Sequence, residues 1–129
     1  MAEPTDRLYS KSHEWALIKG GAATIGITQY AQEQLGDVVF VELPAVGKQL
    51  ERGAVLGNIE SVKAVSELFA PVAGEVAEVN KELEAHPELI NQDPYGAGWV
   101  ARLKVASGAG EGLMDSAAYE RFVAEEGSH

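Results

Sequence analysis

The chain has 129 residues, 46% of them hydrophobic, which is enough for one domain with a modest core. Its 20 acidic and 10 basic side chains give a formal net charge of −10. A surface this negative disfavours nucleic acid and anionic membranes as partners and favours basic patches on other proteins. The sequence has no cysteine, which excludes disulfides, thiolate nucleophiles and thiolate metal sites.

Short runs rich in β-branched residues, separated by glycine and proline turns, predict seven to nine strands. The clearest of them cover residues 15–18, 22–27, 38–43, 55–60, 65–69, 75–79 and 99–105. The run 38–43 (VVFVEL) is almost wholly apolar, so we expect it to be buried on both faces.

Helices are predicted at the edges of this strand pattern. Thr28 can cap a helix over residues 29–35, because its hydroxyl can accept from an otherwise unpaired backbone N–H, and Gly36 ends it. Residues 82–89 read as short helical turns. A last helix is expected over about 115–125, with its aromatic residues packed on the sheets.

The fold class that follows is mostly β, an antiparallel sandwich or flattened barrel with short peripheral helices and a C-terminal helix. We expect residues 1–129 to form a single domain. The N-terminal segment MAEPTDRLYSKSHEW lacks the apolar part of a signal peptide and is too acidic for a transit peptide. No apolar stretch approaches membrane-spanning length. A cytoplasmic protein is therefore expected, and a matrix protein whose transit peptide precedes this sequence stays open.

One lysine stands at a place where the strand pattern must reverse. Two strand-like arms flank the sequence SVKA, and Lys63 falls at the turn between them. A residue there is exposed while its backbone is held by paired strands, which suits enzymatic modification of its amine. Most exposed lysines at turns are only solvated charges. Lys63 is, however, the only basic residue between Arg52 and Lys81, with Glu60 and Glu67 on either side.

No other segment carries a recognisable chemistry. His13, His86 and His129 lack metal-ligand spacing, so no metal site is expected. No serine lies in a G-x-S-x-G elbow, and the stretch SGAGEG lacks the lysine of a phosphate-binding loop. The chain is therefore expected not to be an enzyme.

The segment IESVKAVSELFAPVAGEV resembles the lipoylation segment of the H proteins of the glycine cleavage system. The resemblance spans nearly the whole chain, because further motifs follow the family's order. They are SHEW at 12–15, IGIT at 25–28, VFVELP at 39–44, PELIN at 87–91, PYG at 94–96 and GW at 98–99. The resemblance implies a lipoyl-type barrel-sandwich hybrid of two antiparallel sheets.

It also implies a function. Lipoate would be attached covalently to Lys63, and the chain would carry an aminomethyl intermediate without catalysing any step. The implied partners are a pyridoxal-phosphate glycine decarboxylase, a tetrahydrofolate-dependent aminomethyltransferase, a flavin-dependent dihydrolipoyl dehydrogenase, and a lipoyl ligase or transferase.

The same resemblance assigns roles to individual side chains. Ser12, Glu14 and Glu67 would line the groove that shields the arm, with Glu14 as the partner of the cargo's ammonium group. Glu67 stands where the family more often has aspartate. The residues expected to be recognised by the ligase are Glu60, Ser61, Val62 and Ala64.

Three alternatives stay open. The chain could be a lipoyl domain of a 2-oxoacid dehydrogenase or a biotin carrier, although those usually centre on Asp-Lys-Ala or Met-Lys-Met, and here Val62 precedes the lysine. It could be an H-like relay that donates lipoyl groups to other enzymes. It could also be an unmodified β-sandwich interaction module.

Overall fold

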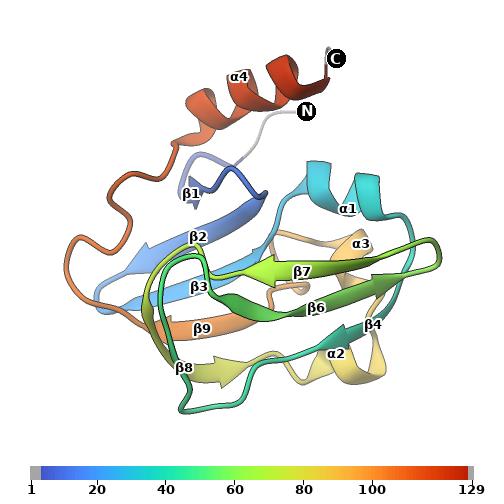
Figure 1. Cartoon of the computed structure of the whole chain (residues 1–129), viewed down its shortest axis with the longest axis horizontal. Coiled ribbons are helices and arrows are strands. Elements are labelled where there is room, and N and C mark those ends of the chain that lie inside the picture. Colours follow the sequence, from blue (N-terminus) through green and yellow to red (C-terminus); the bar gives the residue numbers. More distant parts are fainter. Residues whose placement is uncertain (1–3, 128–129) are drawn as a thin grey trace.

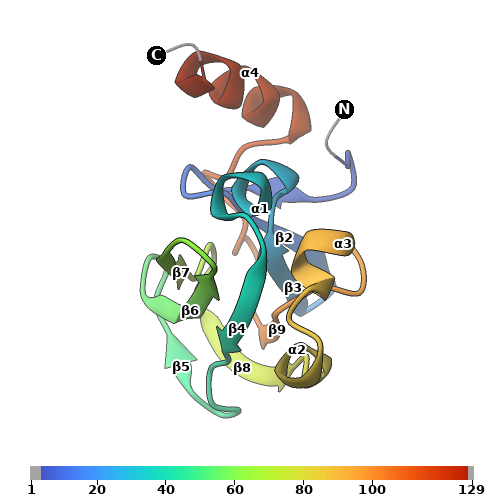
Figure 2. The same cartoon turned by 90° about the vertical axis from the view of Figure 1, so that its right-hand side faces the viewer.

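Two antiparallel sheets face each other in the computed structural model, which describes residues 4–127 (Figures 1 and 2). In spatial order the larger sheet contains β1 (Leu8–Tyr9), β2 (Glu14–Lys19), β3 (Ala22–Ile27), β9 (Ala101–Lys104), β8 (Gly74–Val79) and β5 (Gln49–Leu50). The smaller sheet contains β4 (Val38–Glu42), β6 (Val55–Ser61) and β7 (Val65–Phe69). The predicted fold class is confirmed. The single domain over 1–129 stays a prediction that includes residues outside the described range.

The helices are α1 (Gln29–Leu35), α2 (Glu82–Ala85), α3 (Leu89–Gln92) and α4 (Ser116–Gly127). The predicted cap of α1 is confirmed, because the Thr28 hydroxyl accepts a hydrogen bond from the Ala31 N–H at 3.2 Å. Figure 1 shows α4 outside the sheets, beside β1. No helix among residues 4–127 is long and apolar enough to cross a membrane.

The core lies between the two sheets. Its buried side chains come from both, for example Ile25 and Leu103 from the larger sheet and Ile59 and Leu68 from the smaller one. A second cluster anchors α4 on β1 and β2: Tyr9, Trp15 and Tyr119 are buried, with Phe122 and Val123 packed against them. The expected packing of the last helix through its aromatic residues is confirmed. Burial of large aromatic side chains fixes α4 firmly.

The expectation that residues 38–43 are buried on both faces is wrong. Val38 and Val41 are buried, but Val39 and Phe40 are about half exposed. Two causes combine. The register shifts between Val38 and Phe40, so a bulge breaks the alternation of β4. In addition, the smaller sheet packs only one of its faces against the larger sheet, which leaves its other face to solvent.

Gly26 marks a close approach inside the larger sheet. A Cβ added there would lie 2.6 Å from the ring of Trp15, which is buried and whose Nε1 donates to the Pro94 carbonyl at 3.0 Å. We expect Gly26→Ala to lower the free energy of unfolding by about 1–3 kcal/mol, since the held ring has little freedom to shift.

Chemical denaturation followed by tryptophan fluorescence measures this change. Gly21→Ala is the matched control, because its added Cβ would meet nothing closer than 3.8 Å. Equal stabilities of the two variants would contradict the packing constraint.

Candidate functional site

Lys63 lies exposed at the tip of the hairpin formed by β6 and β7 (Figure 1). The tip is braced on both sides. The Ser61 N–H donates to the Ala64 carbonyl at 2.8 Å, and the Ala64 N–H donates to the Ser61 hydroxyl at 3.1 Å. The Val62 N–H donates to the Asp37 carbonyl at 3.0 Å, which ties the tip to the segment between α1 and β4. The lysine is thus presented on a rigid turn, as predicted from the strand pattern.

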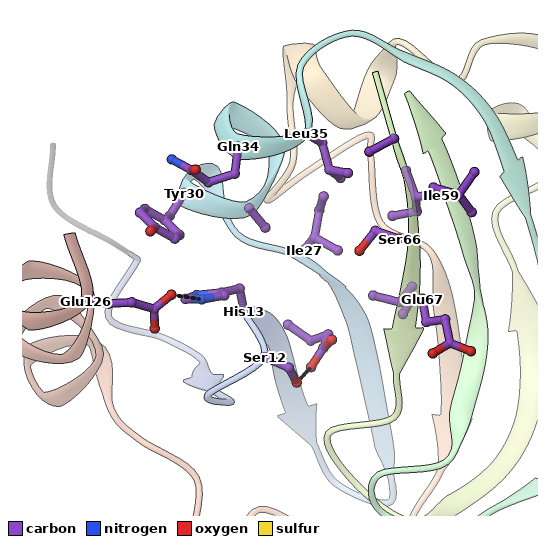
Figure 3. Close-up of a pocket in the computed structure, with 15 residues that line it drawn as sticks. Ser12, His13, Ile27, Tyr30, Gln34, Leu35, Ile59, Ser66, Glu67 and Glu126 are labelled. Carbon is purple, nitrogen blue, oxygen red and sulfur yellow. Dashed lines mark hydrogen bonds and ion pairs between the residues drawn. The ribbon is translucent and has the colours of Figure 1, made fainter. Parts of the chain in front are cut away.

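A groove of about 410 Å³ begins beside this tip (Figure 3). Its walls are α1, the segment leading into β2, and β7. Ala64 and Val65 also line the groove, so its lining begins at the residue next to Lys63. The apolar part of the lining consists of Ile27, Ala31, Leu35, Ile59 and Leu68. Such a surface can bury a hydrocarbon chain away from water.

Gly36, at the end of α1, lies beside the lysine stem. A Cβ at this position would lie 3.4 Å from Cε of Lys63, so the lysine stem lies against the glycine backbone. The backbone of Gly36 also has a φ of 79°, which disfavours residues with a side chain. A glycine therefore suits the place where the segment after α1 passes the lysine side chain.

The polar part of the groove contains a buried carboxylate. Glu14 is 2% exposed. Its Oε1 accepts hydrogen bonds from the hydroxyls of Ser10 at 2.6 Å and Ser12 at 2.5 Å, and its Oε2 accepts from the Phe69 N–H at 3.2 Å. Because Glu14 belongs to β2 and Phe69 to β7, this side chain joins the two sheets.

Burial raises the pKa of Glu14 above its ordinary value, and the hydrogen bonds from Ser10, Ser12 and the Phe69 N–H only partly oppose this. None of the ion pairs formed among residues 4–127 involves Glu14. A cationic donor that reached this carboxylate would favour its ionised form.

The other residues predicted from the sequence lie at different parts of this site. Ser12 contacts Glu14 directly, whereas Glu67 is exposed at the groove's rim and its carboxylate points away from Ser12 (Figure 3). Ser61, Val62 and Ala64 form the tip together with Lys63, and Glu60 lies one step down β6, paired with Val65. Their roles stay predictions.

Sequence reasoning missed the part played by His13. The sequence indicated only that this residue lacks metal-ligand spacing. No group of three or more ligand-type side chains occurs among the described residues, with His129 outside them. His13 Nδ1 lies 2.8 Å from the Tyr119 hydroxyl, and Nε2 lies 3.1 Å from Oε1 of Glu126. Its ring packs on Tyr30 at 4.8 Å. His13 thus joins the groove wall to α4. Because the contacting residues are distant in the chain, no local sequence pattern predicts this contact.

A braced lysine-tipped hairpin, two facing sheets and an adjoining groove define the architecture of a swinging-arm carrier domain. Comparisons with known proteins agree. The family model described as "Glycine cleavage H-protein" matches residues 7–126. The chain is 56% identical to the glycine cleavage system H protein of Beutenbergia cavernae over 126 residues, which cover 98% of this chain and 100% of that protein.

It is also 52% identical to the H protein of Thermus thermophilus over 124 residues, covering 95% of this chain and 97% of that one. The crystal structure of the H protein from Mycobacterium marinum superposes with a TM-score of 0.85 at 38% identity, covering 97% of this chain and 99% of that chain. The chain belongs to the glycine cleavage H-protein family.

The buried Glu14 carboxyl group predicts a pH dependence of stability. Its pKa in the folded state lies above the ordinary value of 4.5. Its stabilising contribution is therefore complete below pH 4.5 and is lost as the pH rises through the folded-state pKa. Glu14→Gln removes the ionisation but can keep the hydrogen bonds, since its amide can accept from the Phe69 N–H and donate to the serine hydroxyls.

We expect the free energy of unfolding of the parent, relative to Glu14→Gln, to fall as the pH rises from below 4.5 to neutrality. Urea titrations at a series of pH values measure this difference. Glu67→Gln is the matched control, because it removes an exposed carboxylate at the rim of the same groove. A parent-to-variant difference independent of pH would show that burial does not perturb Glu14.

Proposed function

We propose that this chain carries lipoate in amide linkage on Nζ of Lys63 and serves as the lipoyl carrier of the glycine cleavage system. The observation that supports this most strongly is the braced, exposed lysine that opens onto a groove ending in a buried carboxylate, in a member of the H-protein family. Like the family, the chain is a carrier component and is not itself catalytic.

Attachment is an acyl transfer to the lysine amine. The deprotonated Nζ attacks the carbonyl carbon of an activated lipoyl group, the bond from that carbon to the leaving group breaks, and the amine's extra proton goes to solvent. The exposure of Lys63 lets the amine reach the attaching enzyme's active site, and the rigid turn spares that enzyme the entropy of ordering a loop.

The carrier would serve a glycine decarboxylase, an aminomethyltransferase and a dihydrolipoyl dehydrogenase in turn. When bound, the lipoyl group supplies a dithiolane that takes up the aminomethyl cargo and two electrons. The protein supplies the tether at Lys63, which gives the cargo a high effective concentration wherever the carrier docks. A cytoplasmic location stays a prediction from the sequence.

The groove would shield the cargo between partners. Its apolar lining suits the hydrocarbon part of the arm, and its buried end places Glu14 where an ammonium group can pair with it. Ser10 and Ser12 hold the Glu14 carboxylate in place. Glu67 would contribute negative charge at the rim.

The attachment site predicts a simple mass result. Protein made in a host that can lipoylate should gain the mass of one lipoyl group, and Lys63→Arg should gain none. Intact-mass spectrometry measures both. Lys81→Arg is the control for a lysine outside the tip. An unmodified parent would favour the interaction module, and a modified Lys63→Arg would refute the site.

A second measurement separates the carrier from a relay that only passes lipoyl groups on. The lipoylated protein should support exchange of the glycine carboxyl group with bicarbonate when mixed with the decarboxylase. Lipoylated protein without this exchange activity would favour the relay.

The role of Glu14 predicts a change in cargo lifetime. Glu14→Gln should be lipoylated as fully as the parent but should release ammonia and formaldehyde from the loaded carrier faster, because the ammonium loses its charged partner. Stopped time courses of free formaldehyde measure the decay, with Glu82→Gln, an exposed carboxylate on α2 outside the groove lining, as the control. Equal decay of Glu14→Gln and parent would remove Glu14 from this role.

A further inference from the structure

An exposed apolar patch surrounds the tip that carries Lys63. Val39, Phe40, Val62 and Val65 are 54%, 51%, 69% and 66% exposed. Contiguous exposed apolar surface rimmed by charge is characteristic of binding surfaces in soluble proteins. Val62 and Val65 belong to the hairpin, whereas Val39 and Phe40 belong to β4, which is distant from Lys63 in the sequence.

Strand register places part of this patch on one face of the smaller sheet. Phe40 pairs with Glu60, and Glu60 pairs with Val65, so the three form one row across the smaller sheet. The next row contains Glu42, Asn58 and Glu67. Directly opposite residues in neighbouring strands point to the same side of a sheet. We call this surface the tip face; it consists of Phe40, Val65, Glu42, Glu60 and Glu67, together with the exposed Val39 at the bulge of β4 and the exposed Val62 in the turn.

The tip face and the groove are different surfaces. Side chains alternate along β7, and in Figure 3 Ser66 is directed into the groove while Glu67 points away from it. Val65 and Glu67, both on the edge strand, border both surfaces, and Lys63 lies where they meet. An arm stored in the groove would therefore leave most of the tip face accessible.

The position of the tip face selects one kind of partner. An enzyme that acts on the far end of the arm can do so at a distance from the hairpin. The enzyme that forms the amide must bring its activated acyl carbon into contact with Nζ of Lys63, so it must cover the surface immediately around that residue. The tip face combines apolar side chains with three carboxylates, which complements an apolar surface rimmed by arginine or lysine.

We propose that the tip face is the docking surface for the lipoyl ligase or transferase, with Val39 and Phe40 of β4 as anchoring contacts. The proposal rests on Lys63 being the attachment site. It adds residues of β4, the strand next to β6 in the smaller sheet, to those expected from the sequence around the lysine.

The test uses unlipoylated full-length protein, a purified lipoyl ligase, lipoate and ATP, with the rate of modification followed by intact mass. Val39→Ser and Phe40→Ser should each lower kcat/KM of the ligase for the carrier by about fivefold or more, as truncation of an interface anchor does. Val46→Ser is the matched control: Val46 is 62% exposed, and Figure 1 shows the β4–β5 loop remote from the hairpin tip.

Glu42→Lys tests the charge part of the proposal without removing an apolar side chain. It should also slow modification, and added salt should slow the parent more than Glu42→Lys. Circular dichroism and thermal unfolding verify that each variant is folded. Even if a β4 variant fails to fold, Glu42→Lys keeps the proposal testable.

Unchanged ligase kinetics in the folded Phe40→Ser, Val39→Ser and Glu42→Lys proteins would overturn the docking surface, while the parent's modification at Lys63 would still support the attachment site. A parent that is never modified would instead overturn the proposed function. Equal losses in reoxidation by dihydrolipoyl dehydrogenase would overturn the assignment of the face to the attaching enzyme.

Discussion

The hydrogen-bonded carboxylate of Glu14 is the interaction on which the geometry of the site depends. It accepts hydrogen bonds from two serine hydroxyls in the turn before β2 and from one backbone N–H of β7, so it links the two sheets at the groove. Burying a carboxylate without a cationic partner carries a substantial desolvation penalty. A purely structural link between the sheets could use an amide or a hydroxyl at lower cost. The charged group becomes favourable when the groove receives a cation, which is what an aminomethyl cargo would bring.

The groove and the tip face meet at Lys63, an arrangement that would separate storage of the proposed arm from access by an attaching enzyme. The groove offers apolar lining and a buried acceptor, both suited to keeping a labile group from water. The tip face offers exposed apolar groups and carboxylates, both suited to contact with another protein. A single flexible side chain at the boundary can serve either surface without any change in the protein backbone. The rigid turn around Ser61 and Ala64 supports this, because its hydrogen bonds fix the boundary in place.

Local signals explain what could be predicted from the sequence. Three elements were predicted at their observed bounds: the strands over 22–27 and 65–69 and the helix over 29–35. Gly20 and Gly21 precede the first strand, Pro71 follows the second, and Thr28 and Gly36 bound the helix. The exposed position of Lys63 followed from hairpin geometry. The exposure of Phe40 did not, because a bulge and an uncovered sheet face depend on pairing with distant strands. The role of Glu14 was predicted only from the family resemblance. Ser10 was missed, because its hydrogen bond to Glu14 depends on the turn between the two residues.

His13 occupies a backbone position that normally suits glycine. Its φ is 72°, a left-handed conformation that costs an ordinary residue about 1–2 kcal/mol. The imidazole offsets this through its contacts with Tyr119, Glu126 and Tyr30, so the last helix is attached to the groove rather than to a remote surface. Loosening α4 would consequently disturb the groove as well as the aromatic cluster under the helix. Glu126 lies in the last turn of α4 and also lines the groove, so this end of the helix forms part of the groove wall.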